Sequence, residues 1–371
     1  MSRSIVSPDD QNVTFVELFF DLVFVFSVTQ IVGLLHADLG WAGAGRAVLV
    51  FWLVWWAWTQ FTWALNAADT THPFVELGAL AATAVAFFMA VSVPAAFAGG
   101  ALGFAVPYVL VRLIGLGLYG RVAEVADPTQ HAAVRTFAAV SLGGLAAVIA
   151  GALAGGEAQY WLWGMTILLD VIAAAVGGRA EGWNLHPEHF GERHGLFVII
   201  ALGETLIVAA AGLTGSTWTP SLVAVAVASV GLTCALWWTY FPRAKPRLDE
   251  ELARRSGAEQ STMARDVFSL AHFPMLCGVV AYAVAVEDAV SHPDAPLALA
   301  ARLALGAGVL LFVGGMALAT WIAVRRWLVP RALLATATAA AAVLVSAVSA
   351  PVSLTLAFLG SAATAAWEER S

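Results

Sequence analysis

The chain has 371 residues, of which 60% are hydrophobic and only 12% are charged, and its mean hydropathy is +0.82. A soluble globular domain carries roughly 25% charged residues, so the composition excludes that class and indicates an all-α polytopic membrane protein. The formal net charge of -7 decides little, because membrane topology depends on where Lys and Arg lie.

A membrane-spanning helix needs about 20 mostly apolar residues, and the sequence contains twelve such runs. In chain order they are 13–35, 42–64, 75–98, 102–122, 134–154, 160–177, 194–213, 220–241, 265–287, 298–323, 331–349 and 352–367. Pro351 separates the last two, which have the weakest pattern. The two longest connections are 178–193 and 242–264.

The first and seventh spans share a pattern that suggests an internal repeat. "VELFFDLVFVFSVTQIV" can be laid against "GERHGLFVIIALGETLIV", and each is followed by a span with paired tryptophans. Parallel repeats of this kind recur in secondary transporters. We therefore predict one transmembrane domain over residues 1–371, with halves at 13–177 and 194–367.

The basic residues predict the topology. When the N-terminus is placed in the cytoplasm, 15 of the 18 Lys and Arg fall at cytoplasmic span ends, Arg46 and Arg302 fall outside, and Arg112 lies in mid-span. Such a bias is the positive-inside pattern. We expect both termini on the cytoplasmic side of a bacterial inner membrane, and the polar N-terminus predicts no removable signal peptide.

Ionisable side chains within spans are costly in lipid and indicate function by default. Glu17 and Asp21 lie four residues apart in "ELFFDLVFVF" and would share one helix face. The other candidates are Arg112, Asp170, Glu204 and His272. Most of them lie between the midplane and the cytosol, which predicts an acidic cavity open to the cytoplasm. The alternative is that Arg112 pairs with one acid while the others are protonated or reach the interface.

Two further patterns admit competing interpretations. Trp52, Trp55 and Trp56 would share a helix face and line a cavity for an apolar or cationic ligand, or pack as ordinary aromatic side chains.

The segment "HPEHFGERH" contains His186, His189 and Glu192, which would bind a metal if they converged. Otherwise Glu192 and Arg193 would form a polar cap for the seventh span. Pro187 and Gly191 predict a poor helix at the start of this segment. Cys234 and Cys277 lie in apolar runs and predict neither a disulfide nor a thiolate metal site.

Four motifs together resemble the bacterial low-temperature-requirement A (LtrA) family. They are "VELFFDLVFVFSVTQ", the Trp-rich second span, "HFGERHGLFVIIALGET" and "HFPMLCGVVAYAVAVEDA". The resemblance covers nearly the whole chain and implies a membrane protein, with no established chemistry. It points to Glu17, Asp21, His189, Glu192, Arg193, Gly203, Glu204 and His272, and Thr205 stands where relatives often have serine.

The first hypothesis for function is a transporter of a small molecule or ion, coupled to protons through these carboxyl groups and His272. The alternative is a membrane-embedded enzyme, or a protein that binds a lipid or cofactor from the cytosolic side. No catalytic motif is present, which favours the non-enzymatic reading, and the sequence identifies no cofactor. We expect the lipid bilayer and a small molecule or ion as partners and no nucleic acid, while a homo-oligomer stays open.

Overall fold

The computed structural model describes residues 4–8, 10–177, 185–325 and 329–367. In these ranges it has fourteen α-helices and no β-strand. Ten helical segments of the described chain are long and apolar enough to cross a membrane, and two shorter apolar helices follow them. The all-α polytopic membrane fold is thus confirmed, and the shorter helices are the two spans with the weakest sequence pattern.

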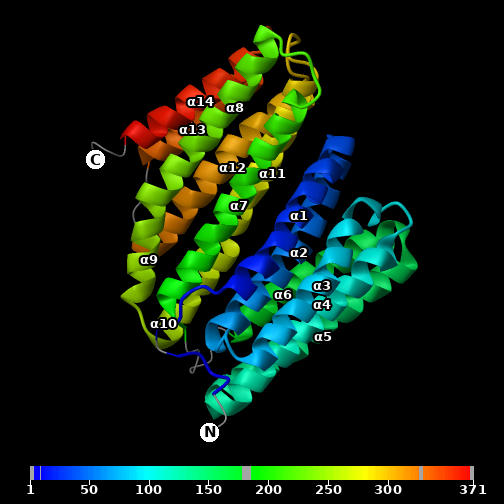
Figure 1. Ribbon diagram of the computed structural model, residues 1–371, viewed down its shortest axis with the longest axis vertical. Coiled ribbons are helices and arrows are strands. Elements are labelled where there is room, and N and C mark those ends of the chain that lie inside the picture. The colour runs from blue at the N-terminus through cyan, green and yellow to red at the C-terminus, as the bar shows by residue number, and fades with distance from the viewer. Residues whose placement is uncertain (1–3, 9, 178–184, 326–328, 368–371) are drawn as a thin grey trace. The chain divides into compact units, whose positions relative to one another are not determined.

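The chain forms two compact units (Figure 1). Unit 1 comprises Met1–Ile31, Gly45–His194 and Leu252–Arg265. Unit 2 comprises Val32–Ala44, Gly195–Glu251 and Asp266–Ser371. The halves 13–177 and 194–367 stay a prediction.

Unit 1 is built mainly from the first six helices and the start of α7. Their bounds are α1 (Phe15–Ala37), α2 (Trp41–Ala67), α3 (Pro73–Val91), the 3₁₀ turn η1 (Val93–Ala95), α4 (Ala101–Ala126), α5 (Pro128–Ala154), α6 (Gly156–Gly177) and α7 (Pro187–Leu213). Consecutive helices α3, α4, α5 and α6 pack side by side (Figure 1). Among the described candidate spans, α2 is the most enclosed, because 83% of its most apolar stretch is buried.

Local sequence signals explain where several helices begin. Pro73 and Pro128 stand in the first turns of α3 and α5, where a missing N–H costs nothing. His72 and Asp127 precede them and accept hydrogen bonds from the next turn. The α5–α6 contact is close because Gly151 lies against Trp163, whose indole donates to the Val148 carbonyl at 3.0 Å.

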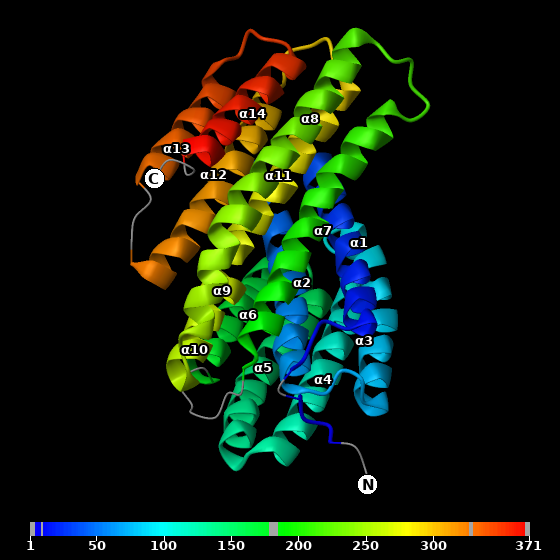
Figure 2. The same cartoon turned by 60° about the vertical axis from the view of Figure 1, so that its left-hand side comes forward.

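Unit 2 contains the rest of α7 and five further long helices, together with most of three short helical segments. The long helices are α8 (Pro220–Thr239), α11 (His272–Ser291), α12 (Leu299–Val324), α13 (Val329–Leu344) and α14 (Ala350–Trp367). The short segments are the π-helical turn η2 (Tyr240–Ala244), α9 (Lys245–Ala253) and the π-helical turn η3 (Ala264–Leu270). Figure 2 shows α8, α11, α12, α13 and α14 as a bundle of neighbours. Helices α11 and α12 approach closely at Gly278 and Gly308: a Cβ at Gly278 would lie 2.7 Å from the Gly308 carbonyl oxygen.

The connection 242–264 contains two short helices, α9 and α10 (Gly257–Met263), and Leu248 and Leu252 are fully buried at a helical spacing of four. One local prediction was wrong. Residues 187–193 begin α7 instead of forming a poor helix. Pro187 is the first residue of α7, a position where proline favours a helix.

Candidate functional site

Five buried side chains of unit 1 form one hydrogen-bonded group, which we call the acid–arginine cluster. Helix α1 supplies two carboxylates, α2 an indole, and α7 an imidazole and a guanidinium. The members are Glu17, Asp21, Trp58, His189 and Arg193, and none is more than 1% exposed. The two acids lie four residues apart on α1, so they share one helix face. That face meets the face of α7 on which His189 and Arg193 also lie four residues apart.

Glu17 is the fully satisfied acid of the cluster. Its Oε1 accepts from Arg193 Nη1 at 2.5 Å, and His189 Nε2 donates to Oε2 at 3.2 Å. Its Oε2 accepts from the backbone N–H of Thr14 at 2.9 Å and from the Thr14 hydroxyl at 3.0 Å. Four donors on two oxygens stabilise the ionised form of this carboxyl.

Asp21 is bonded through one oxygen. Its Oδ1 accepts from Arg193 Nη2 at 2.7 Å and from the Trp58 indole at 2.7 Å. Its Oδ2 is buried and accepts no hydrogen bond from the described residues. Trp58 also presents its ring to the Arg193 guanidinium, 5.7 Å from the ring centroid, a cation–π arrangement.

Asn66 determines which nitrogen of His189 carries the proton. The Asn66 carbonyl oxygen accepts from the His186 backbone N–H at 2.9 Å, and its amide nitrogen donates to the His186 carbonyl at 2.9 Å. These bonds fix the amide orientation, so the second amide N–H points to His189 Nδ1 at 3.0 Å. Nδ1 is therefore an acceptor, and Nε2 carries the hydrogen donated to Glu17.

A second buried group in unit 1 joins α2, α4 and α6. Arg112 donates through Nη2 to Asp170 Oδ1 at 3.1 Å and through Nη1 to the Tyr108 hydroxyl at 2.6 Å. Its Nε bonds Gln60, whose amide nitrogen donates back to the Arg112 carbonyl at 2.9 Å. This arginine–aspartate cluster contains one cation and one acid, so Arg112 is the charge partner of Asp170.

The two remaining ionisable candidates within the predicted spans, Glu204 and His272, lie in unit 2. Glu204 is 1% exposed on α7, and its neighbour Thr205 shares a hydrogen bond with the Thr233 hydroxyl at 2.7 Å. His272 donates through Nδ1 to the Val267 carbonyl at 2.8 Å, so its Nε2 accepts from the Tyr240 hydroxyl at 2.8 Å. Tyr240 begins η2 and His272 follows η3, and π-helical turns are frequent at functional sites.

The structure thus divides the sequence candidates among several places. It brings together Glu17, Asp21, His189 and Arg193, and separately Arg112 and Asp170, whereas Glu204 and His272 belong to unit 2. A single cavity lined by all of the acids stays a prediction.

The aromatic candidates of α2 pack mainly on one another. Trp52 stacks on Trp56 with ring centroids 5.2 Å apart, and Trp55 stacks on Trp58 at 4.9 Å. His194 stands edge-on to Trp58 at 5.1 Å. Both interpretations of these tryptophans stay predictions.

The metal candidates do not converge. Glu192 is exposed while His189 is buried, and in the described part of the chain no group of three or more His, Cys, Asp or Glu has metal-binding geometry.

Sequence reasoning did not identify Trp58, Gln60, Asn66, Tyr108 and Tyr240 as partners of the charged groups. Two signals were available. Tyr108 lies one helical turn before Arg112, and His189 lies one turn before Arg193, at the same spacing as Glu17 and Asp21. Nothing local in the sequence links Tyr240 to His272, which lie 32 residues apart.

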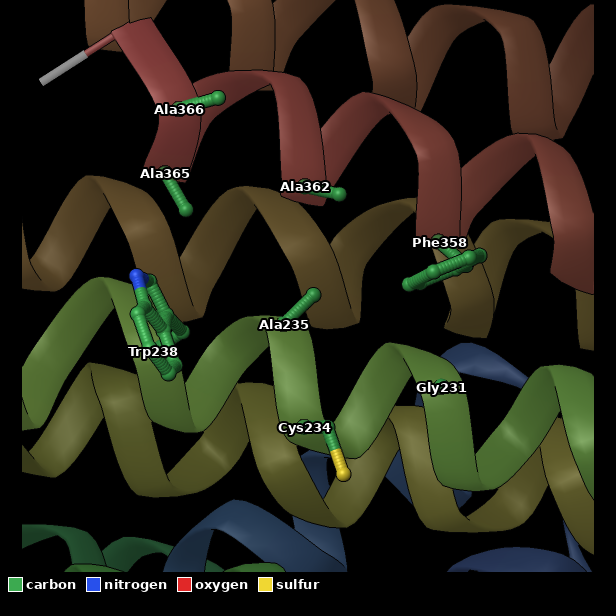
Figure 3. A pocket seen from close by; sticks show the side chains of 8 residues that line it. All are labelled: Gly231, Cys234, Ala235, Trp238, Phe358, Ala362, Ala365 and Ala366. Carbon is green, nitrogen blue, oxygen red and sulfur yellow. The ribbon is translucent and has the colours of Figure 1, made fainter. Parts of the chain in front are cut away.

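Unit 2 also contains an open apolar groove of about 360 Å³ between α8 and α14 (Figure 3). Small side chains and two aromatic rings line it: Gly231, Cys234, Ala235, Trp238, Phe358, Ala362, Ala365 and Ala366. No carboxylate, ammonium or guanidinium group is among them.

The family model described as "Bacterial low temperature requirement A protein (LtrA)" matches residues 12–366. The chain belongs to the LtrA family. This family membership confirms the resemblance carried by the "VELFFDLVFVFSVTQ" and "HFGERHGLFVIIALGET" motifs, which supply Glu17, Asp21, His189 and Arg193 of the acid–arginine cluster.

Among curated proteins, this LtrA-family chain is similar to an uncharacterized protein of Rhizobium meliloti (strain 1021). The two are 29% identical over 297 residues, which cover 77% of this chain and 71% of the relative. No solved structure matches this LtrA-family chain.

Proposed function

We propose that this LtrA-family protein is a secondary transporter that couples the movement of a small molecule or ion to protons. The observation that carries the proposal is the acid–arginine cluster: two carboxylates and one guanidinium, all buried among apolar helices. Buried ion pairs contribute little net stability, because desolvation offsets their attraction. Apolar side chains in these positions would give comparable stability, so stability alone does not explain the presence of three buried ionisable groups. Proton or ion binding explains their presence better.

The proposal places the protein in the bacterial cytoplasmic membrane with both termini inside. The positive-inside distribution of Lys and Arg supports this orientation. It puts the acid–arginine cluster in the cytoplasmic half, because Glu17 lies only one turn into α1. The buried carboxyl of Glu204, farther along α7, is a second candidate for ion or proton binding.

The alternative, a lipid- or cofactor-binding protein, is favoured by one observation: the apolar groove between α8 and α14 has the size of a small-molecule site. Its walls offer no charged group to hold a headgroup or to act in acid–base chemistry. We therefore place transport first.

The test uses purified protein reconstituted into liposomes that contain a pH-sensitive dye. Cations, amino acids and sugars are added outside one class at a time, and the lumenal pH is followed. We expect one class to move protons with the wild type and not with Asp21→Asn. Glu124→Gln is the matched control, because Glu124 forms an exposed pair with Arg121 and should transport normally. Absence of a lumenal pH change with every class would contradict the proposal.

A further inference from the structure

The two buried clusters of unit 1 differ in charge balance. In the arginine–aspartate cluster one guanidinium faces one carboxylate. In the acid–arginine cluster Arg193 faces both Glu17 and Asp21, so the ionised cluster would have a net charge of one negative unit. An uncompensated buried charge costs several kcal/mol, so a group in this position neutralises or finds a counter-ion.

His189 is not that counter-ion. Its Nδ1 faces an N–H of Asn66, and a proton on Nδ1 would oppose this donor. Turning the Asn66 amide to accept instead would break both of its bonds to the His186 backbone. In this hydrogen-bond pattern Nδ1 is an acceptor and the imidazole donates through Nε2 to Glu17.

The two acids are unequal places for the extra proton. Both Glu17 oxygens already accept hydrogen bonds, and a hydroxyl there would face a donor on either side. Asp21 has both of its donors on Oδ1, while its buried Oδ2 accepts none from the described residues. A hydrogen on Oδ2 leaves the bonds from Trp58 and Arg193 in place.

We propose that Asp21 Oδ2 is the proton-binding atom of the acid–arginine cluster. Protonation forms one O–H bond at Oδ2 and leaves Arg193 paired with ionised Glu17, a neutral set. Release returns the proton to water and leaves Arg193 between two carboxylates.

The other titratable or polar groups in the acid–arginine cluster and in contact with its members come from three helices. They are Glu17 on α1, Trp58 and Asn66 on α2, and His189, Arg193 and His194 on α7, with His194 donating through Nδ1 to the Phe190 carbonyl. The inference rests on the proposed function for its role in transport, and the protonated carboxyl itself is observable without transport.

The test is infrared spectroscopy of the full-length protein in lipid, which detects the C=O stretch of a protonated carboxyl. We expect a band in the wild type that moves on exchange into D₂O and is lost in Asp21→Asn. Asn keeps an oxygen for Trp58 and Arg193 and places an N–H where the proton sits, so this variant should fold. Asp170→Asn should keep the band, because Asp170 is paired with its own arginine.

Glu17→Gln gives a second measurement. The Gln amide must turn its N–H groups toward donors that already bond Glu17, which destabilises the variant. The melting temperature of Glu17→Gln should therefore lie well below that of Asp21→Asn. A band of unchanged position and size in Asp21→Asn, or Asp21→Asn melting below Glu17→Gln, overturns the inference. An Asp21 band without proton-linked transport refutes the proposed function alone, and transport without that band refutes the inference alone.

Discussion

Replacing Arg193 by methionine removes the guanidinium that holds both acids of the cluster. Met is close to Arg in length and suits an apolar interior, so the main loss is of charge and hydrogen bonds. The structure shows two such bonds, 2.5 Å to Glu17 and 2.7 Å to Asp21. Removing one partner of a buried ion pair costs about 3–5 kcal/mol, because it leaves an uncompensated buried charge.

Thermal melting of the purified protein measures this loss. For a folded unit of this size each kcal/mol lowers the melting temperature by about 2–4 °C, so Arg193→Met should melt about 6–20 °C below the wild type. The matched control is Arg121→Met, which removes an arginine whose side chain is 57% exposed and pairs with Glu124. An exposed pair is worth at most about 1 kcal/mol, so this control should shift by only a few degrees.

A triple variant separates the charge effect from a packing effect. Arg193→Met combined with Glu17→Gln and Asp21→Asn has no uncompensated buried charge, so it should melt above Arg193→Met alone. Equal melting of Arg193→Met and Arg121→Met, or a triple variant less stable than the single one, would refute the reasoning that the cluster is an electrostatic unit.

Two other substitutions test the neighbouring groups. In Gly115→Ala the added Cβ would lie 2.6 Å from Gln60 Nε2, so we expect the free energy of unfolding to fall by about 1–3 kcal/mol through overpacking. The control is Gly117→Ala, whose Cβ would have nothing within 4 Å and which should melt like the wild type or slightly higher. Equal melting temperatures of the two variants would contradict the close approach at Gly115. Tyr240→Phe leaves His272 Nε2 without its donor and should cost about 1–3 kcal/mol in a melting experiment, and a wild-type melting temperature would argue against the bond.

The helices could be predicted from the sequence because lipid demands long apolar runs that satisfy their own backbone. The ionisable residues inside those runs were equally visible, and Glu17 and Asp21 were recognised as a pair. The last two predicted spans had the weakest apolar pattern, and in the structure they are the two shorter helices, α13 and α14.

The partners of those acids could not be predicted, because hydrogen bonds between distant helices leave no local pattern. The polar-cap alternative put Arg193 at the membrane surface beside Glu192, and the family resemblance named Arg193 as a candidate without giving its partners. In the structure α7 begins earlier than expected, at Pro187, which turns Arg193 inward to Glu17 while Glu192 is exposed. The sequence likewise placed several acids at a membrane depth similar to that of Arg112. The structure shows that its partner is Asp170, because α4 brings Arg112 next to α6.

The most direct test of a titratable site in the membrane is the charge that moves when the pH changes. Wild-type proteoliposomes adsorbed on a solid-supported membrane should give a transient current after a pH step, as protons enter or leave the acid–arginine cluster. Glu124→Gln should give the same current, and Asp21→Asn should give a much smaller one. A current of wild-type size in Asp21→Asn would contradict the account.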